Sequence, residues 1–243
     1  MKNIVIIGGN RGVGFEVVKA CLKNGHRVAV VCKEPADSFP INDNNNVLVR
    51  SFDLRDTEKC VQFIDEVVGL WQKIDGVVFY AGITPFSGLA DCTQELYDRI
   101  FDINLKSTFF ITKTALKTMV NHGGSFVFFG TSHMESGQID RAAYAMSKGG
   151  MKILAEHLSR RYAKYQIRAN IIVMGWTPTE GELELRASFG VSNEELYTEA
   201  AVYIPMGRML TVNDPVPAVM YFLSDESCMV TGSTIRVTGG EYI

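Results

Sequence analysis

The feature that most constrains this chain is a series of short, continuously apolar segments rich in β-branched and aromatic residues. They span residues 4–7, 28–31, 47–49, 76–79, 126–129 and 171–173. Strands that are apolar at every position, rather than at alternate positions, are typical of a parallel sheet covered on both faces. Longer stretches with helical spacing separate them, such as Val61, Ile64 and Trp71 after the capping candidate Asp56. Alternating strands and helices predict an α/β fold with a doubly wound, mostly parallel sheet and helices on both faces.

Composition narrows the domain organisation and the partners. A chain of 243 residues with 47% hydrophobic residues can close one large core, so we expect a single domain over 1–243. The net charge of −3 offers no cationic excess for nucleic acid or an anionic membrane, which leaves small molecules as the expected partners. Five cysteines without a C-x-x-C pair indicate reduced thiols and a cytoplasmic protein, and the first apolar segment is too short for an export signal. The four histidines and the carboxylates show no metal-ligand spacing, and we expect no metal.

The last third of the chain departs from the strand pattern. The polar segment 177–204, with short helices expected around Leu183 and Leu196, is either a surface loop or a substrate lid beyond the carboxyl edge of the sheet. A helix over 216–223 and a last strand over 235–237 should follow. Earlier in the chain, residues 34–46, with two prolines and an asparagine tract, predict an exposed loop.

Gly8, Gly12 and Gly14 form G-x-x-x-G-x-G directly after the first strand and at the start of a helical pattern. Glycines at this place let the backbone turn sharply and approach a pyrophosphate, whose charge meets the N-terminus of the helix. The alternative is a tight structural turn. Because the loop sits in a strand–turn–helix unit, we favour a Rossmann-type dinucleotide site that also includes Asn10, Arg11 and Val13.

The end of the second strand bears on the choice of dinucleotide. An acidic residue there would bind the ribose hydroxyls of NAD and repel a 2′-phosphate. This chain has Cys32 and Lys33 instead, with Arg11 on the same side and Glu34 next in sequence. Two cations and no acid at the strand end favour NADP(H), while NAD(H) stays possible.

Tyr144 and Lys148 lie four residues apart in a predicted helix, so that both side chains share one face. An adjacent ammonium would stabilise a phenolate and suit the tyrosine to acid–base work. The same spacing also occurs in exposed amphipathic helices. Upstream, the strand at 126–130 ends in Thr131 and Ser132, either of which could bind a substrate oxygen or merely cap a turn. Asn104 is a polar amide in the middle of a predicted helix, where it could kink the helix and order a water.

Together these residues resemble the classical short-chain dehydrogenase/reductase family and are similar to 3-oxoacyl-carrier-protein reductases. The resemblance extends along nearly the whole chain. It is carried by the loop 8–14, Asp53, Ala81-Gly82, Asn104, Tyr144, Lys148, Arg168-x-Asn170, Gly175, the run 204–208, the run 222–225 and the glycines at 232, 239 and 240.

The resemblance implies an oxidoreductase acting on a small carbonyl or alcohol, commonly a dimer or tetramer. Its catalytic residues would be Asn104, a hydroxyl, Tyr144 and Lys148. The family's usual spacing between this hydroxyl and the tyrosine selects Thr131, whereas the family's usual residue type, serine, selects Ser132. The further cofactor contacts that it implies are Asp53 and Leu54 at the adenine, then Ala81 and Gly82, and finally Gly175, Thr177 and Thr179 near the nicotinamide and phosphates.

Three positions depart from the family pattern: Phe79-Tyr80 replaces two asparagines, Ile7 replaces a threonine, and Met174 replaces a proline. Two alternatives therefore stand beside the NADP(H)-dependent reductase. One is a catalytically silent dinucleotide-binding regulator, and the other an NAD-dependent alcohol or sugar dehydrogenase. His133 could contact the substrate, but we expect it to be solvated, and Arg141 could recognise an acidic substrate, but we expect it to be an exposed charge. Trp176 should pack in the core or line the site.

Overall fold

The computed structural model describes residues 1–41, 44–136 and 140–241. Within these residues seven strands form one sheet in the order β3-β2-β1-β4-β5-β6-β7, and every neighbouring pair is parallel. The strands are β1 (Asn3–Ile7), β2 (Arg27–Cys32), β3 (Val47–Ser51), β4 (Gly76–Phe79), β5 (Gly124–Thr131), β6 (Ile167–Met174) and β7 (Thr234–Val237). The predicted doubly wound parallel α/β fold is thereby confirmed.

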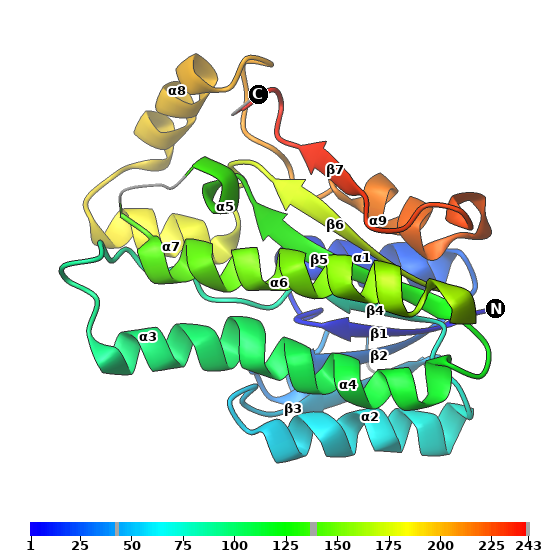
Figure 1. The fold of residues 1–243 in the computed structure, drawn as a ribbon. Helices are drawn as coiled ribbons and strands as arrows, with labels where there is room; N and C mark the ends of the chain where they lie inside the picture. Colours follow the sequence, from blue (N-terminus) through cyan, green and yellow to red (C-terminus); the bar gives the residue numbers. More distant parts are fainter. Residues whose placement is uncertain (42–43, 137–139, 242–243) are drawn as a thin grey trace.

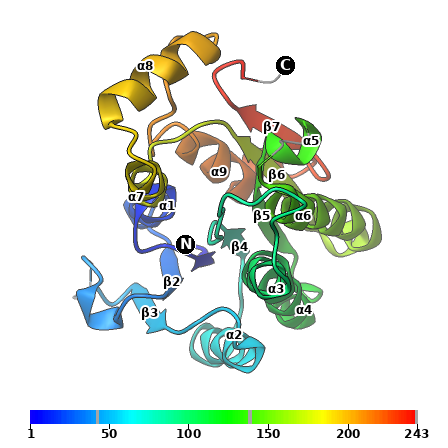
Figure 2. The ribbon, with the colours of Figure 1, turned by 90° about the vertical axis from the view of Figure 1, so that its left-hand side faces the viewer.

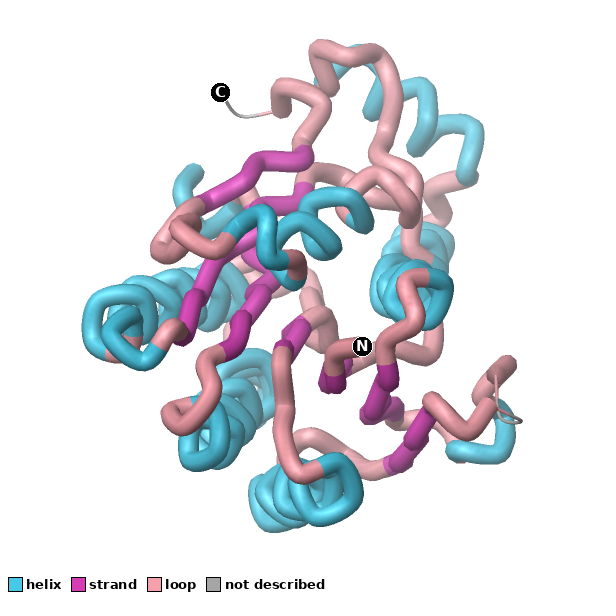
Figure 3. Tube along the Cα trace, turned by 90° about the vertical axis from the view of Figure 1, so that its right-hand side faces the viewer, coloured by secondary structure: helices cyan, strands magenta, loops and turns pink. Residues whose placement is uncertain are grey.

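Helices cover both faces of the sheet, which explains why its strands are apolar at every position (Figures 1 and 2). On one face α2 (Thr57–Trp71), α4 (Ser107–Met119) and α6 (Ala142–Arg161) share a core with alternate residues of the central strands. On the other face α1 (Gly12–Lys23) and α9 (Val216–Leu223) share a second core with the intervening residues. The same layers are visible from the opposite end of the sheet (Figure 3).

The strand order reverses at β1, and this reversal positions the site. The chain runs outward from β1 through β2 to β3, then returns to place β4 on the other side of β1. The connections after β1 and β4 consequently leave the sheet in opposite directions and open a crevice at the carboxyl ends of these strands. Ligands of open α/β sheets bind in such a crevice.

The remaining helices lie at or beyond this carboxyl edge (Figure 1). They include α3 (Gln94–Phe101), which continues into α4 through a π-helical segment, η2 (Asp102–Lys106), and the short α5 (His133–Ser136). The segment 177–204 forms α7 (Glu180–Ser188) and α8 (Asn193–Tyr203), as predicted from the pattern around Leu183 and Leu196. Single 3-10 turns complete the structure at η1 (Ala36–Ser38), η3 (Ala163–Tyr165) and η4 (Asp225–Ser227).

The predicted exposed loop at 34–46 needs one correction. Phe39 is only 3% exposed and packs edge-on against Phe15, with ring centroids 5.8 Å apart. It anchors the segment to the core beside α1, since an aromatic ring buries enough apolar area to order a short turn. Residues 42–43 of the same segment lie outside the described residues. Among the described helices, none has both the length and the apolar character needed to cross a membrane.

Candidate active site

The glycine loop between β1 and α1 is packed so tightly that only glycine fits at two of its positions. Gly8 has φ of +89°, and a Cβ there would lie 2.7 Å from the backbone nitrogen of Ala81. A Cβ on Gly14 would lie 2.0 Å from the carbonyl oxygen of Gly8. The loop is thus pressed against the end of β4, and the backbone at the start of α1 is brought to the crevice. Such a cradle fits the pyrophosphate of a dinucleotide.

The two aromatic residues that replace the family's asparagines are accommodated by packing. Phe79 is buried and stacks on Phe128, with ring centroids 4.9 Å apart. Tyr80 lies against the glycine loop, edge-on to Phe129, with its phenol next to Gly12 and the backbone of Val13. Burial raises the pKa of Tyr80 to about 12, so this phenol stays neutral.

The opposite end of the crevice contains the residues predicted near the adenosine. Cys32, Lys33, Asp53 and Leu54 all line the same cavity. The Sγ of buried Cys32 donates to the carbonyl oxygen of Glu34, 3.3 Å away. A hydrogen bond from Arg55 lowers the pKa of Asp53, so its carboxylate is ionised and engaged locally.

Glu34, which follows Lys33 in the sequence, is held by the glycine loop. Asn10 Nδ2 donates to Glu34 Oε2 at 2.7 Å. Both residues also line a smaller adjoining cavity together with Arg11 and Cys32. The region next to the end of β2 therefore contains Arg11, exposed Lys33 and a hydrogen-bonded carboxylate.

The structure places Tyr144 at the first turn of α6, facing the end of β5. The side chains of Thr131 and Thr84 lie close enough to its phenol to lower the pKa of Tyr144. Burial raises the pKa of Tyr144, Thr131 opposes that rise, and the charge of Arg141 also lowers the pKa. Ser132 is buried beside Thr131, but only Thr131 of these two acts on the pKa of the phenol. This difference favours Thr131 as the hydroxyl of the site.

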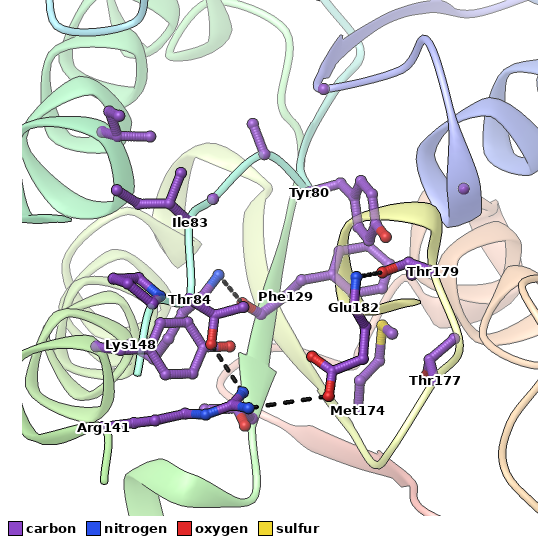
Figure 4. A pocket seen from close by; sticks show the side chains of 18 of the residues that line it. Tyr80, Ile83, Thr84, Phe129, Arg141, Lys148, Met174, Thr177, Thr179 and Glu182 are labelled. Carbon is purple, nitrogen blue, oxygen red and sulfur yellow. Dashed lines mark hydrogen bonds and ion pairs between the residues drawn. The ribbon is translucent and has the colours of Figure 1, made fainter. Parts of the chain in front are cut away.

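Lys148 lies one turn further along α6 and is 4% exposed. Its Nζ donates to the carbonyl oxygen of Phe129 at 2.9 Å (Figure 4). Burial of this ammonium lowers the pKa of Lys148 from 10.5 to about 8. Burying an ammonium costs desolvation free energy, and charged groups that are buried despite this cost are often found at functional sites.

Asn104 occupies the centre of the π-helical segment and is completely buried. Its Oδ1 accepts from the nitrogen of Ile83 at 2.8 Å, and its Nδ2 donates to the oxygen of Ile83 at 3.0 Å and to Ser147 Oγ at 3.1 Å. Single π turns inside α-helices often mark functional sites. Asn104 interrupts the regular helix as predicted, and its amide fixes the strand-end loop after β4 against α6.

Sequence reasoning missed Ser147. This completely buried serine accepts from Asn104 and donates to the carbonyl oxygen of Tyr144 at 2.7 Å, so it connects the two residues. Its position between Tyr144 and Lys148, in the same turn of the predicted helix, was the only available signal. Thr84, the second neighbour of the phenol, gave none, because it lies far from the tyrosine along the chain.

The residues predicted near the nicotinamide and phosphates lie together after β6. A Cβ on Gly175 would lie 2.7 Å from Glu241 Oε2 and 2.8 Å from the Cα of Thr238, so the backbone passes very close to the C-terminal segment. Thr177 Oγ1 donates to the oxygen of Gly175 at 3.1 Å, and Thr179 caps the N-terminus of α7. Gly175, Thr177 and Thr179 line the cavity, together with Ala81 and Gly82.

Two expectations about neighbouring side chains are wrong. Arg141 is not an exposed charge: it is 7% exposed and donates to Thr84 Oγ1 at 2.9 Å. His133 is not solvated either, because its ring stands edge-on to that of Tyr144 with centroids 6.1 Å apart. Burial lowers the pKa of His133 to about 4. Trp176 lines the cavity and also packs on the small core of α8.

All the predicted site residues line one cavity or contact a residue that does. The cavity has a volume of about 1150 Å³ and extends from Lys33 to Arg186. Drug-sized ligands fill roughly 300–1,000 Å³, so this space suits a dinucleotide together with a small substrate. Among the described residues, no group of three or more histidines, cysteines or carboxylates could hold a metal ion.

Comparison with known proteins gives matches along nearly the whole chain. A family model described as enoyl-(acyl carrier protein) reductase matches residues 7–241. The 2-(S)-hydroxypropyl-CoM dehydrogenase 3 of Xanthobacter autotrophicus is 29% identical over 244 residues, covering 98% of this chain and 95% of that protein. The acetoacetyl-CoA reductase of a Synechocystis species is 28% identical over 243 residues, covering 99% and 96%.

The fold is also similar to that of solved structures. A short chain dehydrogenase family protein from Francisella tularensis superimposes with a TM-score of 0.89 and 25% sequence identity. That similarity covers 100% of this chain and 98% of the other.

Proposed function

Because the chain belongs to the short-chain dehydrogenase/reductase family, we propose that it transfers a hydride between NADP(H) and a small carbonyl or alcohol, with Tyr144 as the acid–base residue. The family makes it an oxidoreductase of alcohol and carbonyl groups that uses a nicotinamide dinucleotide. The preference for NADP(H) and the role of each residue belong to the proposal.

One observation carries the proposal: the Tyr144 phenol and the Thr131 hydroxyl lie next to each other at the cavity wall, where Thr131 opposes the rise in the pKa of Tyr144. Two adjacent hydroxyls can bind one carbonyl oxygen and stabilise the charge that develops on it. In the reductive direction Tyr144 gives its proton to that oxygen, and Thr131 holds the oxygen in place. A bound nicotinamide supplies the hydride, or accepts it when an alcohol is oxidised.

The protonation states suit reduction. Burial raises the pKa of Tyr144, so the phenol carries its proton at neutral pH and can act as an acid. Lys148 is protonated below about pH 8 and lies against the same strand end, where it can replace a proton lost from the phenol. Asn104, through Ser147, holds the backbone of Tyr144 in this arrangement.

The test is NADPH oxidation with a panel of ketones and aldehydes. We expect Tyr144→Phe to lower kcat by a factor of roughly 10²–10⁴, the usual contribution of general acid catalysis. Tyr165→Phe, at a tyrosine that is 39% exposed in the turn η3 after α6, is the matched control. Thr131→Val should reduce turnover more than Ser132→Ala. Binding of NADPH without turnover on the whole panel, and without any effect of Tyr144→Phe, would support the silent regulator instead.

Lys33 and Arg11 support the NADP(H) preference, because both cations lie where a 2′-phosphate would be placed and Glu34 is engaged by Asn10. We expect Lys33→Ala to lower the ratio of kcat/KM for NADPH to that for NADH about tenfold, the effect of one charge-assisted hydrogen bond. Lys113→Ala, at an exposed position on α4, should leave the ratio unchanged. A wild-type ratio at or below one would favour the NAD-dependent dehydrogenase.

We also propose that residues 1–243 act as one domain with 177–204 as the substrate lid, and that the protein forms a homo-dimer or homo-tetramer. Phe109 of α4 is 50% exposed, and Met146 and Ile153 of α6 are 57% and 64% exposed. Large apolar side chains on the outer faces of two adjacent helices favour a protein interface. Light scattering after size-exclusion chromatography tests this, and a monomer at micromolar concentration would contradict it.

A further inference from the structure

The wall of the cavity next to Tyr144 contains a buried arginine. Arg141 immediately precedes α6, and the backbone around it is fixed by the adjacent chain: Ser87 nitrogen donates to the oxygen of Asp140 at 2.7 Å, and Ala142 nitrogen to the oxygen of Ser87 at 3.3 Å. Its guanidinium lies over the ring of Phe86 at 4.2 Å. Arg141 is therefore a rigidly placed charge rather than a mobile surface side chain.

The charge of Arg141 is only partly compensated by the protein. Its Nη1 donates to Thr84 Oγ1, but its Nη2 is 3.8 Å from Glu182 Oε1, beyond hydrogen-bond distance. Its Nε is buried and has no hydrogen-bond partner among the described residues. Asp140 also lines the cavity but forms no ion pair with Arg141 in the described structure. The Nε–Nη2 edge of a guanidinium is the edge that binds a carboxylate with two parallel hydrogen bonds.

Glu182 is shared with other donors and contributes only one negative charge. Its Oε1 accepts from Arg186 Nε at 3.0 Å and from Trp176 Nε1 at 3.1 Å. Arg186 lies over the rings of Phe86 and Trp176, at 5.2 and 5.0 Å, so both arginines and Glu182 form one cluster at the cavity wall. The two guanidinium groups of the cluster therefore share a single carboxylate, while Asp140 lines the same cavity without an ion pair to Arg141 among the described residues.

The cluster is connected to the proposed catalytic tyrosine. Arg141 donates to Thr84 at 2.9 Å (Figure 4), and both side chains lower the pKa of Tyr144. The guanidinium is therefore close enough to the phenol for its charge to act on it. A small molecule whose carbonyl oxygen contacts Tyr144 can then place an anionic group at Arg141.

We propose that the substrate is a small oxo acid or hydroxy acid whose anionic group, a carboxylate or sulfonate, binds Arg141 in place of Glu182. This inference rests on the proposed hydride transfer and names its substrate class. Glu182 belongs to α7 in the segment 177–204, so the incoming anion competes with the side chain that connects this helix to α6. Arg186 keeps Glu182 partnered when Arg141 changes its partner.

The kinetic test compares acetoacetate and pyruvate with their methyl esters, which keep the ketone and lose the charge. We expect wild-type kcat/KM to be higher for each acid than for its ester. Arg141→Gln should lower the acid-to-ester ratio at least tenfold, and Arg141→Lys should restore part of it. Glu182→Gln keeps an acceptor oxygen for Trp176 and removes the competing charge, so it should raise the ratio. Ratios near one in the wild type, or unchanged in Arg141→Gln and Glu182→Gln, overturn the proposal.

A binding measurement separates this inference from the proposed function. Calorimetry with propanoate, methanesulfonate and propanamide needs no turnover. We expect both anions to bind more tightly than the amide, and Arg141→Gln to remove the difference. Tighter anion binding without hydride transfer to any carbonyl would refute the function and keep the anion site. Hydride transfer with equal binding of propanoate and propanamide would refute the anion site and keep the function.

Discussion

Replacing Lys148 by methionine is expected to remove a pH-dependent cost from the folded protein. The side chain is 4% exposed, and its ammonium donates to the carbonyl oxygen of Phe129 at 2.9 Å. Burial lowers the pKa of Lys148 from 10.5 to about 8. The protein keeps this charge at the end of β5 although an apolar side chain would pack there with less desolvation.

The sign and size of the effect follow from these two pKa values. Below about pH 8 the folded protein must hold a buried proton, whereas the unfolded chain holds it in water up to pH 10.5. The cost is therefore complete below pH 8 and is relieved as pH rises from 8 towards 10.5. A drop of this size corresponds to about 3 kcal/mol at neutral pH, of which about 2 kcal/mol is relieved by about pH 9.5.

Urea unfolding of the wild type and of Lys148→Met, followed by circular dichroism, measures this difference. The wild type should gain about 2 kcal/mol of unfolding free energy relative to the variant between about pH 7 and about pH 9.5. Lys152→Met, one turn further along α6 where the side chain is 37% exposed, is the control and should show no comparable change. A wild-type-to-variant difference that is constant over this pH range would refute the burial of a charged lysine in the site.

Three further outcomes are expected. Burial lowers the pKa of His133 from 6.5 to about 4, so the wild type should lose stability relative to His133→Gln as pH falls from 6.5 towards 4; an imidazole that titrates near 6.5 in NMR spectra would contradict this. Gly14→Ala should abolish NADPH binding, measured by cofactor fluorescence, because the added Cβ would lie 2.0 Å from the carbonyl oxygen of Gly8. Gly69→Ala, at an open position of α2, is the control and should stabilise the protein by about 0.5–1 kcal/mol in thermal unfolding. Ser147→Ala should cost about 1 kcal/mol and reduce kcat, because it takes one partner from Asn104; unchanged kcat in steady-state assays would make Ser147 a purely structural residue.

Much of the fold could be predicted because its signals are local. Continuous apolar segments are required wherever a strand is covered on both faces, and β1, β2, β4, β5 and β6 all have such sequences. The segment around Phe39 was misjudged because one aromatic residue among prolines and asparagines is a weak signal. Its burial depends on Phe15, which belongs to α1 and is separated from it by the whole of β2.

In the candidate site too, local features could be predicted from the sequence and contacts between distant residues could not. Their spacing of four residues was enough to pair Tyr144 with Lys148, and the glycine loop could be recognised from its position after the first strand. Thr131 and Ser132 could not be separated, because the direction of a hydroxyl at a strand end depends on how the next helix packs. Only the approach of α6 brings Tyr144 to Thr131, and only the loop after β4 brings Thr84 to the same phenol.

The sequence by itself therefore determined the alternation of strands and helices, the glycine loop and the tyrosine–lysine pair, since each depends on neighbours within a few residues. Only the tertiary structure brings Thr131 next to Tyr144 and shows that Arg141 is a buried, incompletely paired charge near it. Whether a charge is solvated or desolvated depends on what packs around it in space. Phe86 and Glu182 surround Arg141 from the loop after β4 and from α7, and a sequence pattern has no regular period over such long separations along the chain.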